Sequence, residues 1–164
     1  ILAPVMPYQA EDMWQNTPEC QRAGLESVLL SDWVEIKNEW NNPQLEEDFT
    51  KILKTREVVT KAIEPLRAEK KIGSSLEVAV YVKSKDTDLL KENLKDLADI
   101  FIVSQSYLAD SAPADSLNEY SENDITVWVT KANGEKCERC WKYRKLGEHP
   151  GHETICSDCY EAIK

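Results

Sequence analysis

Four cysteines near the end of the chain have the type and spacing of metal ligands. Cys137 and Cys140 form one C-x-x-C pair, Cys156 and Cys159 form a second, and fifteen residues separate the pairs. Two intervening residues let both sulfurs of a pair reach one ion, and zinc favours four thiolates in a tetrahedron with Zn–S bonds near ~2.3 Å. The spacing predicts one structural Zn²⁺ ion in a closed shell, which leaves no open position for catalysis.

Other uses of these cysteines remain open from the spacing alone. Either pair could be a redox dithiol, although two pairs at this spacing favour zinc. His149 and His152 lie between the pairs and could replace a cysteine, or they could be ordinary loop residues. A module of about thirty residues has too little core to fold unaided, so metal binding would supply its folding free energy.

Two side chains around the first pair could contact nucleic acid. Arg139 lies inside the first C-x-x-C turn and Trp141 follows it directly. A backbone fixed by zinc would hold the indole as a stacking platform for an unpaired base, and the guanidinium could bind a phosphate or a guanine edge. Alternatively, Trp141 covers the metal and packs on the neighbouring domain. The spacing does not decide between these interpretations.

The charge distribution argues against nonspecific nucleic-acid binding. The formal charge is −10, yet residues 131–148 hold six Lys or Arg and three Glu, so this segment is +3 and the rest is −13. A small positive patch on an acidic body suits a discriminating contact, although it could equally be a solvated surface. The fifth cysteine, Cys20, stands alone, and an odd count without a secretory signal favours metal over disulfides. The short apolar start, residues 1–6, predicts neither a membrane span nor a signal peptide, so a cytoplasmic protein or an excised piece of one is expected.

The patterning predicts an α+β protein in which helices precede a small sheet. Pro7 fits the first turn of a short helix. A long helix is expected from Pro43, with an apolar face from Leu45 to Leu66, a kink at Pro65 and a C-terminal cap at Gly73.

The middle of the chain predicts a strand, a helix and a strand, followed by a third strand. The expected strands are 76–82, 100–103 and 125–129, the expected helix is 87–97, and residues 109–124 are expected to be an acidic loop. Asn133-Gly134 predicts a turn into the cysteine module. The expected domains are a helical part (1–73), a small α/β part (74–131) and a zinc-binding module (132–164).

Several segments resemble one family of class I aminoacyl-tRNA synthetases. Cys137-Glu-Arg-Cys-Trp141 with Cys156-Ser-Asp-Cys159 is similar to the C-terminal zinc finger of bacterial isoleucyl-tRNA synthetases, and a related finger occurs in formamidopyrimidine-DNA glycosylases. The stretch from Ile1 to Trp14 resembles the "LAP..PH.AEE.W" segment of the helical anticodon-binding domain. Residues 27–33, 56–67 and 71–76 resemble later segments of the same domain. The chain departs from the family at Tyr8, where His is usual, and at Pro65, where the helix usually continues.

The resemblance implies a function that the chain would perform within a larger enzyme. The parent would be an isoleucine–tRNA ligase that uses ATP and Mg²⁺, and this chain would be its C-terminal, tRNA-reading end without a catalytic residue of its own. Its partner would be tRNA for isoleucine, bound on the anticodon side by Arg139 and Trp141. We expect a cytoplasmic monomer that binds neither membrane nor DNA. The alternatives are a structural zinc module for protein contacts and the finger of a DNA glycosylase, although the catalytic and helical regions that a glycosylase requires are missing from the sequence.

Overall fold

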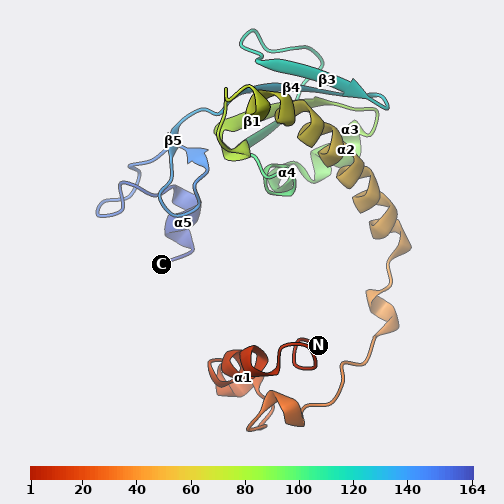
Figure 1. The fold of residues 1–164 in the computed structure, drawn as a ribbon, viewed down its shortest axis with the longest axis vertical. Helices are drawn as coiled ribbons and strands as arrows, with labels where there is room; N and C mark the ends of the chain where they lie inside the picture. The colour runs from red at the N-terminus through yellow and green to blue at the C-terminus, as the bar shows by residue number, and fades with distance from the viewer. The chain divides into compact units, whose positions relative to one another are not determined.

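The computed structural model describes residues 1–164 as two compact units, Ile1–Asn42 and Pro43–Lys164 (Figure 1). The first unit contains one α-helix and three 3₁₀ turns: α1 (Pro7–Gln15), η1 (Glu19–Gln21), η2 (Val28–Leu30) and η3 (Asn38–Trp40). None of the helices in the chain is both long enough and apolar enough to span a membrane. The expected division at residues 73 and 131 stays a prediction.

The first unit is held together by polar contacts rather than by a large core. Pro7 begins α1, as its fixed φ predicts, and Ala10 is the buried apolar residue of this helix. The Glu11 carboxylate accepts hydrogen bonds from Ser27 Oγ at 2.7 Å and from the Val28 N–H at 3.1 Å. The bonds from Ser27 and Gln15 hold the pKa of Glu11 below its usual value. One carboxylate thus joins α1 to the chain that follows it.

The second unit begins with the long helix α2 (Pro43–Ala68), which confirms the predicted start at Pro43. Its buried apolar residues begin at Ile52, whereas Leu45, Phe49 and Leu53 of the predicted apolar face are exposed. Pro65 lies only one turn before the helix end, so the helix continues through it. The prediction of a cap at Gly73 was wrong. Lys70 adopts the left-handed conformation (φ 57°), and the Lys71 N–H donates to the Leu66 carbonyl, as in a Schellman motif.

The remaining elements of the second unit form a four-stranded mixed sheet, with helices against it, and a small C-terminal module that carries the four cysteines. They are η4 (Ser75–Glu77), β1 (Val78–Lys83), α3 (Thr87–Glu92), α4 (Leu94–Ile100), β2 (Gln105–Leu108), β3 (Asn118–Glu122), β4 (Ile125–Lys131), β5 (Glu135–Lys136), β6 (Tyr143–Arg144) and α5 (Ser157–Glu161).

The sheet order is β2-β1-β4-β3, and β1 pairs parallel with β2 and antiparallel with β4. The parallel pair confirms the predicted order of strand, helix and strand, although the second strand is β2 and not the predicted residues 100–103. Alternate residues of β1 and β4 join one core with side chains from α2, α3 and α4, so these helices cover the same face of the sheet. The α+β class is therefore confirmed, and the sheet edge at β2 lies next to the module that carries the cysteines.

Three sequence predictions in this region were wrong. The expected single helix 87–97 breaks at Asn93 into α3 and α4, which leaves Leu94 exposed. The expected strand 100–103 is instead the last residue of α4 and the turn after it: Ile102 is left-handed (φ 58°) and the Val103 N–H donates to the Ala98 carbonyl. Phe101 and Val103 are buried at this helix end, whereas Ile102 is exposed. A short apolar run does not by itself distinguish a strand from a helical segment.

The third error concerns the expected acidic loop 109–124, which contains the edge strand β3. This strand, Asn-Glu-Tyr-Ser-Glu, is polar because only one of its faces meets the core, where Tyr120 packs. A polar edge strand is also a common protection against edge-to-edge pairing with other chains. Its polarity therefore concealed the strand from the sequence pattern.

Candidate zinc centre and nucleic-acid interface

The four predicted cysteines converge on one point. Their Sγ atoms all lie within 4.8 Å of one another. Cys137 Sγ lies 3.8 Å from Cys159 Sγ, and Cys140 Sγ lies 3.8 Å from Cys156 Sγ. A tetrahedron with Zn–S bonds of ~2.3 Å places its sulfurs about 3.8 Å apart. The arrangement thus fits one structural zinc ion, and the donor set of four thiolates suits that metal.

Short elements bring the two cysteine pairs together. Cys137 follows β5, and the chain turns through Cys140 before it returns as β6. Cys156 is the N-cap of α5, and Cys159 lies within that helix. Gly134 (φ 98°) begins this ribbon, where an added Cβ would lie 2.5 Å from the Arg144 carbonyl oxygen. The sequence Asn133-Gly134 therefore permits the close crossing that starts the module.

The sulfurs form most of the core of this module. Cys137, Cys156 and Cys159 are buried, and the apolar side chains packed on them are Leu146 and Ile155. So small a cluster cannot offset the conformational entropy of some thirty residues. The free energy of zinc binding would therefore be the main source of the module's stability.

The surroundings of Cys137, Cys140 and Cys156 shift the pKa values of these thiols in different directions. Burial raises the pKa of Cys137, but backbone N–H groups, led by that of Cys140, outweigh it and lower the pKa to about 6. Burial raises the pKa of Cys140 to about 12, and burial also raises that of Cys156. Four clustered thiols cannot all ionise without a cation between them, and a bound metal removes this conflict because it deprotonates its ligands.

The two histidines between the pairs do not join the cysteine cluster. His149 stacks on Tyr160, with ring centroids 3.9 Å apart, and its Nε2 lies 3.2 Å from Ser157 Oγ. His152 also lies against Tyr160. Both histidines therefore pack on α5, which leaves a shell of four cysteines.

Trp141 and Arg139 both project into solvent. Trp141 is 61% exposed, and Arg139 is exposed as well. The Trp141 N–H donates to the Cys137 carbonyl at 2.9 Å, and the residue has a left-handed backbone (φ 66°). A bulky residue rarely adopts this conformation, and such outliers are frequent at functional sites. The alternative in which Trp141 packs over the metal or against the sheet does not fit this exposure.

The charges of the module divide into paired and unpaired groups. Lys142 pairs with Asp99, Arg144 lies 3.5 Å from Asp158, and Lys145 lies 2.8 Å from Glu148. Arg139 forms no ion pair. Lys136 forms none either, and its Nζ lies 5.3 Å from the centroid of the Trp141 ring. The unpaired positive charges around the first cysteine pair are therefore Lys136 and Arg139. The sequence pattern did not single out Lys136.

Ser104, directly before β2, and Gln105, its first residue, hold the module against the sheet. Ser104 Oγ accepts the Tyr143 N–H at 2.7 Å, and it also donates to the Leu76 carbonyl. The Gln105 amide donates to the carbonyls of Asn133 (2.7 Å) and Tyr143 (3.1 Å). Nothing in the sequence distinguishes Ser104 and Gln105 from other polar residues, so these contacts were not predicted.

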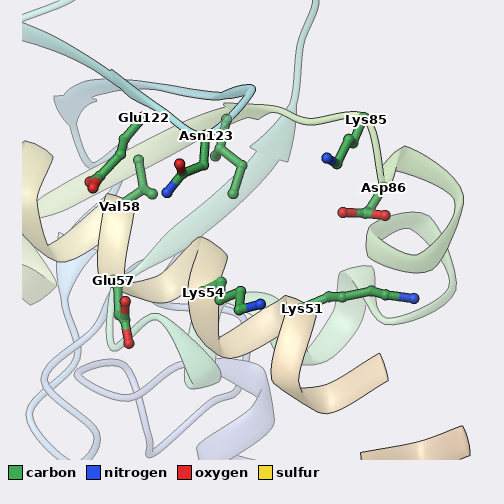
Figure 2. A pocket seen from close by; sticks show the side chains of 9 residues that line it. Lys51, Lys54, Glu57, Val58, Lys85, Asp86, Glu122 and Asn123 are labelled. Atoms are coloured by element: carbon green, nitrogen blue, oxygen red, sulfur yellow. The ribbon is translucent and has the colours of Figure 1, made fainter. Parts of the chain in front are cut away.

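A cavity of about 520 Å³ elsewhere in the second unit is a competing candidate site. In Figure 2, Lys51 and Lys54 extend from α2, while Lys85 and Asp86 lie on the opposite side. Its lining holds three lysines and three carboxylates (Glu57, Asp86 and Glu122). Balanced charge gives no preference for an anion or a cation, so the cysteine module remains the better candidate.

Comparisons with known proteins identify two families that this chain resembles. A family model described as the anticodon-binding domain of tRNA ligase matches residues 1–82, and one described as a zinc finger found in FPG and IleRS matches residues 134–162. The chain is similar to isoleucine–tRNA ligases from Caldanaerobacter subterraneus (37% identical over 100% of the chain) and Rippkaea orientalis (39% over 99%). A third such ligase, from Syntrophomonas wolfei, is 37% identical over 99% of the chain. The chain spans 18% of the length of each of these relatives.

Proposed function

Because the chain belongs to the family of anticodon-binding domains of tRNA ligases, we propose that it is the C-terminal, tRNA-reading region of an isoleucine–tRNA ligase. The named activity of its relatives supports this proposal, and so does the finger model that matches its last residues. The parent enzyme would attach isoleucine to its tRNA with ATP and Mg²⁺. Those ligands would bind outside this region, which is non-catalytic.

The observation that carries the proposal is the exposed indole of Trp141, directly after the turn that holds the ligands Cys137 and Cys140. An exposed aromatic ring on a rigid backbone can stack an unpaired base at a low entropic cost. The guanidinium of Arg139, free of carboxylates, can bind a phosphate or a base edge. We therefore assign tRNA contact to Arg139 and Trp141, and zinc ligation to Cys137, Cys140, Cys156 and Cys159.

The division of labour along the chain belongs to the same proposal. Residues 1–73 form part of the helical anticodon-binding domain, residues 74–131 a small α/β junction domain, and residues 132–164 the zinc-binding module. The hydrogen bonds from Ser104 and Gln105 support a junction role, because they orient the module on the sheet. The protein acts as a cytoplasmic monomer on tRNA for isoleucine and binds no DNA.

Two other functions would use the same zinc centre. A structural module for protein contacts would need the ion but not the exposed ring. A DNA-glycosylase finger would bind duplex DNA, and the match of residues 1–82 to a tRNA-ligase domain weighs against it.

Aminoacylation by the full-length enzyme with Trp141→Ala tests the proposal. We expect kcat/KM for tRNA to fall about 5- to 150-fold, the range for loss of one stacked base, while isoleucine-dependent ATP–pyrophosphate exchange stays unchanged. Trp141→Phe, which keeps a ring, should retain most of the activity. A Trp141→Ala enzyme with normal zinc content and normal charging would favour the protein-contact alternative.

A further inference from the structure

We propose that Lys136 is a positioning residue that covers one face of the Trp141 ring and leaves the other face for a single unpaired base. This inference rests on the proposed function, in which Trp141 contacts tRNA. It adds a residue to that site and a geometry of stacking: the base lies on one side of the indole and does not pair with a second base across it.

The distance between the two side chains supports an attractive contact. Lys136 Nζ lies 5.3 Å from the centroid of the indole ring. An ammonium within about 6 Å of a tryptophan ring is attracted by the negative potential of the ring face. A cation in this place excludes a base from the same face.

Both backbones that carry this contact are fixed. Lys136 lies in the β5–β6 ribbon, where it pairs with Tyr143. Trp141 is held by its N–H bond to the Cys137 carbonyl, one residue beyond Lys136. The zinc-bound turn and the ribbon therefore set the separation of the two side chains, and only their rotamers remain to be chosen.

The lack of a carboxylate partner explains why the Lys136 ammonium lies over the Trp141 ring. Its neighbours in the basic segment, Lys142, Arg144 and Lys145, each pair with a carboxylate. Lys136 has no carboxylate partner, so the indole is the group that attracts its ammonium.

A double-mutant cycle separates positioning from simple phosphate binding. The full-length, zinc-loaded protein would be titrated with an unmodified anticodon stem-loop RNA of tRNA for isoleucine. The variants are Lys136→Met, which keeps the apolar stem, Lys136→Arg, which keeps a cation, Trp141→Ala, and the double variant Lys136→Met with Trp141→Ala.

We expect Lys136→Met to weaken binding about two- to fivefold, the range for an exposed cation–π contact, and Lys136→Arg to restore most of the loss. In the Trp141→Ala background, Lys136→Met should have no further effect. An equal loss in both backgrounds would identify Lys136 as an independent phosphate contact and overturn the proposal, as would no loss in either. Normal binding by Trp141→Ala alone would instead contradict the underlying function.

Discussion

The side-chain amide of Gln105 forms hydrogen bonds with both the N–H and the carbonyl of Asn133. Its Oε1 accepts the Asn133 N–H at 2.9 Å, and its Nε2 donates to the Asn133 carbonyl at 2.7 Å. The amide thereby acts as a strand neighbour for the residue at which the zinc module begins. A glutamine at the edge of the sheet thus helps, together with Ser104, to orient the module that carries Trp141.

Replacement of Gln105 by glutamate tests the contribution of these hydrogen bonds. Gln105→Glu keeps the shape and the acceptor, but it removes two donations and places an oxygen against the carbonyls of Asn133 and Tyr143. We expect the variant to be about 1–3 kcal/mol less stable, the range for unsatisfied polar groups. Urea unfolding measures the change, and Gln44→Glu is the control, at an exposed position of α2 where one surface hydrogen bond, to Asp48, is lost. Equal stabilities of the two variants would contradict the claim that the hydrogen bonds of Gln105 stabilise the protein.

Removal of zinc tests the origin of the module's stability. A chelator should unfold residues 135–164 and leave the sheet and α2 largely folded, because the main core holds no cysteine. Amide hydrogen exchange should lose protection at the module and keep it in β1 and β4. Unchanged protection of the module after verified loss of metal would show that its own packing suffices.

Lys70 provides a test of the unexpected helix end. Its left-handed backbone (φ 57°) strains any residue with a Cβ, whereas glycine adopts it freely. Lys70→Gly should therefore raise the stability of the protein by about 0.5–1 kcal/mol. Lys71→Gly, at the next residue, should not. Thermal unfolding of both variants measures the change in melting temperature. A change of the same sign in both would contradict the assignment of Lys70 as the left-handed cap of α2.

The pair Lys61–Glu122 predicts a small dependence of stability on pH. Lys61 Nζ lies 2.5 Å from Glu122 Oε2, and this bond lowers the pKa of the carboxyl. A carboxyl with a lowered folded pKa stabilises the protein above its unfolded pKa and loses that contribution as the pH falls through the folded pKa. Glu122→Gln should therefore be less stable than the parent at neutral pH, and the difference should shrink in acid. Salt should also reduce it, because both groups are solvent-accessible. Thermal unfolding across a pH series would refute the pairing if the difference stayed constant.

Binding of RNA should depend weakly on salt. The unpaired cations beside the indole are Lys136 and Arg139, so few phosphates are neutralised. Because Lys136 lies over the indole, Arg139 is the cation left to neutralise a phosphate, and for single-stranded RNA one neutralised phosphate gives a slope of about −0.7 in a plot of log K against log salt concentration. Titration of the anticodon stem-loop at several salt concentrations measures it. A much steeper slope would indicate a larger basic surface than the acidic composition allows.

The cysteine spacing was a reliable predictor because the chemistry of a zinc shell is local. Four thiolates must meet one ion whatever surrounds them, and Cys137, Cys140, Cys156 and Cys159 do converge. The start of α2 was likewise predictable, since the first turn of a helix accepts proline at Pro43.

Features decided by tertiary contacts were not predictable. The strand β3 is polar because it has one buried face, and Ile102, in the turn after α4, adopts a conformation that its own side chain disfavours. Lys136 meets Trp141, and Gln105 meets Asn133, only through the folded backbone. Local propensity carries no signal for such pairings.

The affinity of the zinc-loaded protein for the anticodon stem-loop, measured with and without the indole of Trp141, tests the central claim most directly. We predict that Trp141→Ala weakens this affinity about 5- to 150-fold at constant zinc content and stability. An affinity equal to that of the unsubstituted protein would contradict the claim that this exposed ring reads an unpaired base.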